Sequence, residues 1–188
     1  MRMRIIITMV AAMFMIACTS GSGAANKRGS NPEAEKNEIR VGIDIGERAP
    51  ELAFESPKGE IIALSSLRGK MVLIDFWAAW CPPCRKENPD LVKTYYEFRD
   101  KEFINGSGFT IYGVSLDRKK EDWVAAIEKD HLEWDTQVSD LKGWQSVPAA
   151  MYGVMGIPTS FLIDGDGIIV AKGLQGEYLN NKLKELLK

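Results

Sequence analysis

The chain has 188 residues, of which 45% are hydrophobic and 27% are charged, a composition typical of one soluble globular domain with short extensions. Its formal net charge is -2 and it contains no basic block, so nothing in its charge points to a nucleic-acid partner.

The first 17 residues have the pattern of an export signal. Arg2 and Arg4 make a short positive segment, and an apolar run of 13 residues follows from Ile5 to Ala17. This run is shorter than the roughly 20 residues that span a bilayer. It therefore predicts a signal peptide over residues 1–17.

Cys18 stands directly after this run. Met15-Ile16-Ala17-Cys18 resembles a bacterial lipoprotein signal, in which cleavage precedes a cysteine that is then lipidated, although Met15 replaces the usual Leu. The alternative is an ordinary secretory signal cut near Ala24-Ala25, which would remove Cys18. Lipidation of Cys18 is favoured because a small residue precedes it and a polar linker follows it. Loss of residues 1–17 lowers Lys+Arg from 24 to 22 against 26 acidic residues, which leaves a side-chain charge of -4.

Residues 18–40 contain the predicted lipidated cysteine and a stretch of Gly, Ser, Asn, Lys and Glu that cannot bury much apolar surface. We expect a flexible tether here and a folded domain over residues 41–188. In that domain, Leu52 to Glu55 and Ile61 to Leu64 flank a Pro-Lys-Gly turn and predict a hairpin. Met71 to Phe76 is a continuous apolar run, which predicts a buried strand.

Pro82 and Pro83 favour a helix start, and the charged stretch after them predicts a helix to about Phe103 with a kink at Pro89. The remaining predicted elements are a loop at 105–108, a strand at 109–115, a helix at 120–130, a short strand near Trp134, a hairpin of 159–163 with 168–171, and a closing amphipathic helix over 179–187. This order predicts an α/β fold in which the strands near 71 and 109 are parallel and joined by a right-handed crossover.

Cys81 and Cys84 lie three residues apart on the first predicted helical turn. Side chains at this spacing are about 5–6 Å apart, so a small adjustment forms a disulfide. A loop of this size stabilises a fold little, which favours a pair that cycles between dithiol and disulfide. A zinc site is not expected, because this pair and His131 provide too few ligands.

Three motifs in order resemble the thioredoxin fold, and more closely its exported TlpA/ResA-like branch, over about Gly46 to the C-terminus. The motifs are Asp75-Phe76-Trp77-Ala78-x-Trp80-Cys81-x-Pro83-Cys84, Gly156-Ile157-Pro158-Thr159, and Phe161-Leu162-Ile163-Asp164-x-x-Gly167. The resemblance implies a central mixed sheet flanked by helices, with an N-terminal β-hairpin and a central insertion.

Cys81 is the expected nucleophile, because a helix N-terminus favours the thiolate that attacks. Cys84, one turn deeper, is expected to resolve the mixed disulfide. Asp75 lies in an apolar strand, so desolvation should raise its pKa. The resemblance implies that Asp75 relays a proton to and from Cys84; the alternative is a carboxylate held by a lysine or water with a structural effect only.

The resemblance also implies a cis bond between Ile157 and Pro158, lying against the cysteines, and a backbone there that pairs with an extended substrate. Trp80, Pro82, Pro83 and Ile157 are the other expected substrate contacts. Trp77 is expected to pack in the core, and Trp123, Trp134 and Trp144 to be core or surface-packing residues. Arg85, Lys86 and Glu87 are expected on an exposed helix face, although Glu87 belongs to the family pattern.

These residues predict a thiol–disulfide oxidoreductase, without a cofactor or metal, tethered by lipid outside the cytoplasm and acting as a reductant. Expected partners are disulfide-containing exported proteins, among them apocytochrome c as one candidate, and a membrane thiol relay as electron donor; we expect a monomer. The alternatives are a thiol oxidase or isomerase on the same scaffold, a thiol peroxidase, and a non-catalytic binding subunit.

Overall fold

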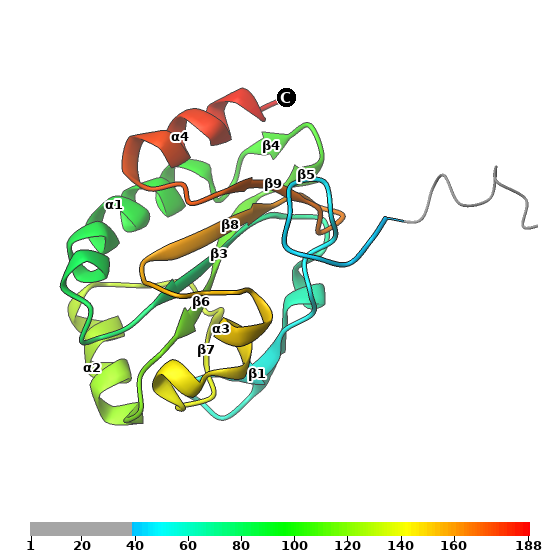
Figure 1. Ribbon diagram of the computed structural model, residues 1–188. Helices are drawn as coiled ribbons and strands as arrows, with labels where there is room; N and C mark the ends of the chain where they lie inside the picture. Colours follow the sequence, from blue (N-terminus) through cyan, green and yellow to red (C-terminus); the bar gives the residue numbers. More distant parts are fainter. Residues whose placement is uncertain (1–38) are drawn as a thin grey trace, which may run out of the picture. The chain divides into compact units, whose positions relative to one another are not determined.

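The computed structural model describes residues 39–188; the predicted signal peptide, Cys18 and most of the tether lie outside these residues. A seven-stranded mixed sheet runs through the domain in the order β2-β1-β7-β6-β3-β8-β9 (Figure 1). The strands are β1 (Ala53–Glu55), β2 (Ile61–Ala63), β3 (Met71–Trp77), β6 (Phe109–Ser115), β7 (Gln137–Ser139), β8 (Thr159–Ile163) and β9 (Ile169–Lys172).

The centre of the sheet is formed by β3 and β6, which pair in parallel over all seven residues of each strand. Every residue of both strands is buried, as their continuous apolar sequences predict. β7 is parallel to β6, and β8 is antiparallel to β3. The predicted N-terminal hairpin forms as antiparallel β1 and β2, and β1 joins the sheet beside β7.

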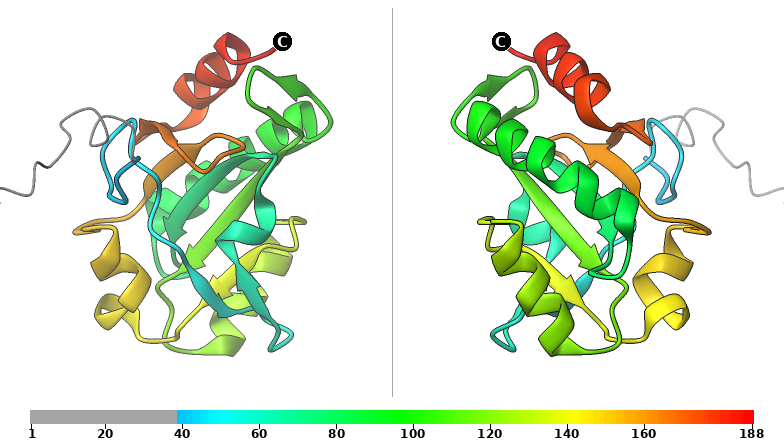
Figure 2. Two further views of the ribbon diagram at one scale, coloured as in Figure 1. Left: turned by 90° about the vertical axis from the view of Figure 1, so that its right-hand side faces the viewer. Right: turned by 90° about the vertical axis from the view of Figure 1, so that its left-hand side faces the viewer.

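Four helices connect or close the sheet: α1 (Pro82–Phe98), α2 (Lys120–Lys129), α3 (Val147–Met151) and α4 (Gly176–Glu185). α1 and α2 are successive crossovers in the same direction across the sheet, so right-handedness puts them on one face. α4 packs beside α1, where Thr94 donates a hydrogen bond to Asn180. α3 lies on the opposite side of the sheet from α1 and α2 (Figure 2). Thus the chain has the expected thioredoxin-like arrangement, with α2, β7 and α3 inserted between β6 and β8.

The segment after α1 corrects one expectation. The helix ends at Phe98 and not near Phe103, and residues 102–107 form the short hairpin of β4 (Glu102–Phe103) and β5 (Gly106–Ser107). This early end lets Phe103 pack into the core opposite Phe98, with ring centroids 6.4 Å apart. The local sequence pattern alone favours a longer helix. The helix ends early because Phe103 is buried in the core, which is a tertiary effect.

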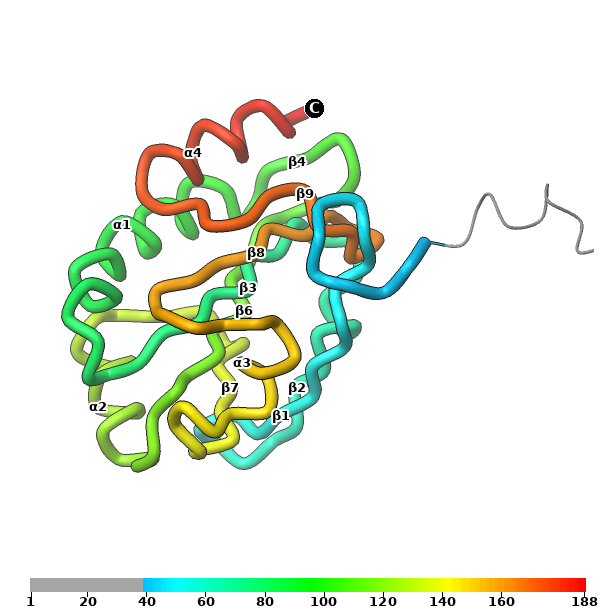
Figure 3. The backbone as a smooth tube through the Cα atoms, in the orientation of Figure 1, coloured from blue at the N-terminus to red at the C-terminus, as the bar shows by residue number. Residues whose placement is uncertain are grey.

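Three short elements have no strong sequence signal: the 3-10 helices η1 (Leu64–Leu67) and η2 (Gly143–Gln145), and α3. The strand expected near Trp134 begins three residues later, at Gln137. The first described residues run beside β9, where the Gly46 N–H donates to the carbonyl oxygen of Ile169 and the Ile169 N–H donates to that of Glu47 (Figure 3). No helix within residues 39–188 has the length and apolarity needed to cross a membrane.

Two buried tyrosines attach the N-terminal segment to the core. Tyr112 in β6 donates its hydroxyl to the carbonyl oxygen of Ile62 at 2.8 Å, and Tyr152 donates to the carbonyl oxygen of Pro50 at 2.6 Å. The Tyr152 ring also packs on Phe76 and Phe161, with centroids 5.4 and 5.1 Å away. These bonds hold β2 and the segment before β1 against the central part of the sheet.

Tyr152→Phe should therefore lower the free energy of unfolding by about 1–2 kcal/mol, because it leaves the Pro50 carbonyl without its partner while keeping the ring packing. Urea unfolding of the oxidised protein measures this. Tyr178→Phe is the matched control, since Tyr178 is 77% exposed, and should change stability by less than about 0.5 kcal/mol. Equal stability of both variants would contradict the role of the Tyr152 bond.

Candidate active site

The two cysteines meet at the start of α1. Cys81 is the N-cap residue, and its sulfur accepts the backbone N–H of Cys84 at 3.2 Å. Pro82 and Pro83 occupy the first two helical positions, where a missing N–H leaves no helical bond unmade. Cys81 and Cys84 form a disulfide with Cα atoms 5.3 Å apart, and both side chains are buried. The spacing thus produces the redox pair that the sequence predicts.

The loop before β8 comes to the same place. The peptide bond between Ile157 and Pro158 is cis, as expected from the resemblance. The carbonyl oxygen of Ile157 lies 3.8 Å from the Cys81 sulfur, although 76 residues separate them in sequence. Met155, two residues before Ile157, is 96% exposed. Gly156 is exposed and Ile157 and Pro158 are only partly buried, so this segment reaches the surface next to Cys81.

Trp80 lies beside the disulfide with half of its surface exposed. Its indole N–H donates to the carbonyl oxygen of Leu116 at 3.3 Å, which holds the ring over the loop after β6. Trp144 of η2 packs on Trp80 with ring centroids 6.0 Å apart and is also half exposed. Together they line a cavity of about 350 Å³ with Asp117 and Asp122. Trp144 is thus a surface-packing residue, as the sequence predicts, and nothing in the chain near it signals that its partner is Trp80.

A polar network supports the turn that carries Trp80 and Cys81. Asp117 accepts hydrogen bonds from the Ala79 N–H at 3.0 Å and from the Ser115 hydroxyl at 2.8 Å. Arg85 donates to the Ala79 carbonyl oxygen at 3.1 Å and forms a two-bond ion pair with Asp130. The expectation that Arg85 is on an exposed helix face is therefore wrong. Its partner, Asp130, follows α2 and is 45 residues away in sequence.

Asp75 lies at the centre of β3, between Gly113 on β6 and Ser160 on β8. It is 5% exposed. Burial, with a smaller contribution from the charge of Glu87, raises the pKa of Asp75 to about 8. The expected desolvation of this carboxyl is thus present, and the charge that adds to its pKa shift is that of an acid, Glu87.

Glu87 is half-buried, which corrects its expected exposure. Its desolvation raises its pKa to about 7, the N–H of Gly176 partly opposes that shift, and the charge of Asp90 adds to it. Asp75 and Glu87 therefore form a pair of carboxyls that titrate near neutral pH. The charge of Glu87 adds to the cost of ionising Asp75, so it contributes to the raised pKa of Asp75.

The remaining residues that the sequence analysis singles out are in the core, on the surface or outside the described part of the chain. Trp77, Trp123 and Trp134 are buried in the core. Lys86 is exposed and His131 is exposed at the end of α2. Among residues 39–188, no group of three or more His, Cys, Asp or Glu side chains could hold a metal ion. Cys18 is not among the described residues.

Residues 45–172 match the model of the AhpC/TSA family. The chain belongs to the AhpC/TSA family. Among its relatives are the thiol-disulfide oxidoreductase ResA of Bacillus thuringiensis subsp. konkukian, 33% identical over 78% of each chain, and the thioredoxin-like protein YneN of Bacillus subtilis, 34% identical over 69% of this chain and 71% of YneN. The solved thioredoxin domain of a thiol-disulfide oxidoreductase from Bacteroides vulgatus is 42% identical, covers 78% of this chain and all of its own, and has a TM-score of 0.69.

These similarities and the Cys81–Cys84 disulfide agree on the activity. The chain is a ResA-like thiol–disulfide oxidoreductase of this family with a thioredoxin-like domain. The resemblance on which the sequence interpretation rests is therefore confirmed, and so is the fold. The individual roles of Asp75, Pro158 and Trp80 remain predictions.

The raised pKa of Asp75 predicts how stability changes with pH. The folded protein holds the Asp75 proton up to about pH 8, whereas the unfolded chain releases it near pH 3.8. The unfolded state therefore binds fewer protons between these values, and the free energy of unfolding falls as pH rises from about 4 to about 8. Asp75→Asn cannot ionise, so its stability advantage should grow from near zero at about pH 4 to a few kcal/mol at about pH 8.

Denaturant unfolding of the oxidised protein at several pH values measures this difference. Glu87 contributes a decline of the same sign, but it is present in both proteins and largely cancels. Asp100→Asn, at an exposed position, is the control and should follow the wild-type curve. Parallel curves for Asp75→Asn and wild type between pH 4 and 8 would show that Asp75 ionises normally.

Proposed function

We propose that this protein is a lipid-tethered, extracytoplasmic reductant that transfers two electrons from Cys81 and Cys84 to disulfides of exported proteins. The observation that carries the proposal is that the Cys81–Cys84 disulfide lies at the start of α1 with the Ile157 backbone beside it, while the strand that leads to it carries the buried Asp75. The names of its relatives support thiol–disulfide chemistry, and the direction of electron flow is the part we infer.

In the proposed reaction, the Cys81 thiolate attacks one sulfur of a client disulfide. A mixed disulfide forms between Cys81 and the client, and the first client thiolate leaves. Cys84 then loses its proton and attacks the Cys81 sulfur, which releases the second client thiolate and forms the Cys81–Cys84 disulfide. The client gains two electrons and two protons; one proton is that of Cys84 and the other comes from solvent.

The helix start favours the first step. The Cys84 N–H directed at the Cys81 sulfur and the positive end of the α1 dipole stabilise a thiolate at Cys81. In the second step, Asp75 is the proposed acceptor for the Cys84 proton. A carboxyl with a pKa of about 8 can both take and return a proton near neutral pH, which an ordinary aspartate does poorly.

The surface around Cys81 suits an extended polypeptide. The backbone at Ile157 and Pro158 is proposed to pair with the client chain, as in strand addition. Trp80 and Trp144 offer aromatic surface on the other side, with Asp117 and Asp122 next to them. Pro82, Pro83 and Ile157 complete the proposed contact area. This surface would accept many clients, because backbone and aromatic contacts depend little on side-chain identity.

Location is inferred from residues 1–40. A lipid on Cys18 and the polar tether after it would keep the domain near a membrane but free to reach exported clients. Because such a compartment oxidises thiols, the disulfide must be reduced again by electrons that cross the membrane, for which a membrane thiol relay is the proposed donor. Thiols of apocytochrome c are one candidate client, and we propose that the protein acts as a monomer.

The redox potential tests the direction. Equilibration with glutathione or dithiothreitol should give a value nearer to about -270 mV than to -120 mV, and the reduced protein should reduce insulin. A potential well above about -180 mV would contradict the reductant and favour an oxidase or isomerase, which refolds a reduced client from the disulfide form. Rapid loss of peroxide with a thiol donor would favour a peroxidase instead.

Trapping tests the roles of the two cysteines. Cys84→Ala should hold its client on Cys81 as a mixed disulfide, because no second thiol is present to release it. Mass spectrometry of the trapped species names the client. Cys81→Ala is the matched control and should trap nothing; clients held equally by both variants would contradict Cys81 as the nucleophile. Survival of the protein's cellular activity in Cys81→Ser, Cys84→Ser, which has no dithiol to reduce a client, would support a non-catalytic binding role.

The mature N-terminus tests the tether. When the full chain is expressed in a bacterial host, the protein should sediment with membranes, and its intact mass should correspond to a lipidated Cys18. Cys18→Ser should lose the lipid mass, whereas Cys84→Ser should keep it. A mature chain that begins near Ala24 or Ala25 would show an ordinary secretory signal.

A further inference from the structure

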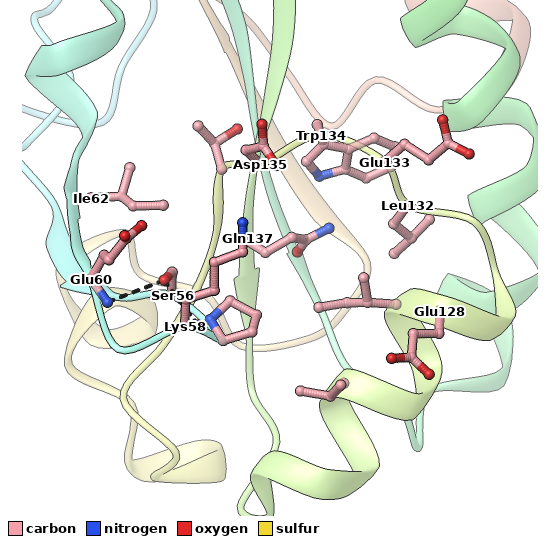
Figure 4. A pocket seen from close by; sticks show the side chains of 14 residues that line it. Ser56, Lys58, Glu60, Ile62, Glu128, Leu132, Glu133, Trp134, Asp135 and Gln137 are labelled. Atoms are coloured by element: carbon pink, nitrogen blue, oxygen red, sulfur yellow. Dashed lines mark hydrogen bonds between the residues drawn. The ribbon is translucent and has the colours of Figure 1, made fainter.

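A second cavity lies away from the disulfide, between the β1–β2 turn, the outer side of α2 and the segment that leads into β7 (Figure 4). Its volume is about 490 Å³, in the range of about 300–1,000 Å³ that holds small ligands. It shares no lining residue with the cavity beside Trp80 and Trp144. Nothing in the proposed redox reaction uses it.

Gln137 forms the floor of this cavity. It pairs with Gly113 of β6, which in turn pairs with Asp75 of β3, so the three residues make one row across the sheet. A side chain at Gly113 would collide with the Gln137 amide, so the glycine leaves the space that this amide occupies. Figure 4 shows the amide directed into the cavity between Trp134 and Leu132.

The amide is buried without a partner. Gln137 is 2% exposed, and within residues 39–188 neither its oxygen nor its nitrogen makes a hydrogen bond. The indole N–H of Trp134, on the same wall, is also unpaired in this part of the chain. Buried polar groups in native proteins are nearly always hydrogen-bonded. The floor therefore offers two kinds of donor and one acceptor to whatever enters, which matches the carbonyl and N–H of a peptide bond.

The walls and the rim restrict that ligand further. The walls are apolar, formed by Ile62, Val124, Ile127, Leu132 and the Trp134 ring. The rim carries four exposed carboxylates and a single lysine; these are Glu60, Glu128, Glu133, Asp135 and Lys58. Within residues 39–188, none of them forms an ion pair, and Glu133 only accepts the Tyr96 hydroxyl. This excess of negative charge attracts cations.

We propose that this cavity binds an extended peptide segment in which an apolar residue is flanked by lysine or arginine. The apolar side chain enters between α2 and Ile62, and the peptide carbonyl accepts hydrogen bonds from Gln137 Nε2 or Trp134 Nε1. The peptide N–H donates to Gln137 Oε1, and the basic side chains meet the carboxylates of the rim. The site does not include Cys81 or Cys84, so its test is independent of the proposed redox function.

The test is an NMR titration of the ¹⁵N-labelled, oxidised full chain with the peptide Ac-Lys-Leu-Lys-NH₂ up to 10 mM. A ligand this small should bind with a Kd of about 1 mM. The largest shifts should be those of the Gln137 side-chain amide and the Trp134 indole N–H. Ac-Glu-Leu-Glu-NH₂ tests the charge of the rim and Ac-Lys-Gly-Lys-NH₂ tests the apolar walls; each should bind at least about fivefold more weakly.

Variants separate the floor from the rim. Gln137→Leu keeps the side-chain size but removes the hydrogen bonds, and should weaken binding about fivefold without lowering the melting temperature. Glu128→Gln, at an exposed position, keeps the proposal testable if Gln137→Leu fails to fold, and should weaken binding about twofold at low salt. Gln145→Leu and Glu102→Gln, both exposed away from the cavity, are the matched controls and should bind as wild type does.

Several results would overturn the proposal. These are no shift at 10 mM, equal binding of the acidic peptide, shifts centred on Trp80 and Trp144, and unchanged binding by Gln137→Leu and Glu128→Gln. The double variant Cys81→Ser, Cys84→Ser should still bind the peptide through the cavity. Loss of binding in that variant would assign the peptide to the redox surface and not to this site.

Discussion

The burial of β3 is the constraint on which the rest of this structure depends. All seven residues of the strand are inaccessible, with β6 on one side and β8 on the other, so the position of Trp77 at its end is fixed by the core. The turn after that end delivers Cys81 to the start of α1, and the loop before β8 delivers Ile157 to the same edge. The same burial desolvates Asp75. One strand therefore fixes the location of the disulfide and carries the buried acid.

Keeping a carboxyl in such a strand costs stability at neutral pH, because its charged form is poorly solvated there. Glu87 adds a second half-buried acid, where a basic partner would have lowered both pKa values. This arrangement opposes the stability of the fold and suits the transfer of a proton near the cysteines. Carboxyls with strongly raised pKa values are common at functional sites, where they are kept for their chemistry although they lower stability.

The row formed by Asp75, Gly113 and Gln137 links two polar sites through one glycine. Asp75 is on the strand that leads to the redox pair, and Gln137 lines the acidic cavity beside α2. Each is a polar side chain on a buried strand, and each lacks an ordinary structural explanation. A buried polar side chain on a sheet strand is unfavourable for folding, and such positions are often functional. We therefore propose that Asp75 takes part in the reduction of a client disulfide and that Gln137 binds a peptide.

The Cys81–Cys84 pair and the burial of Asp75 could be predicted from short spacings and apolar runs, which act locally. The thioredoxin-like fold and the cis bond before Pro158 followed from motifs that resemble a known family. The sequence failed for the end of α1, for the ion pair of Arg85 with Asp130, for the burial of Glu87 and for the position of Trp144 beside Trp80. It also gave no sign of the cavity around Gln137. The contacts of Arg85, Trp144 and Glu87 join residues 45 or more positions apart, and the other features depend on which face of an element meets the core; neither can be read from local sequence.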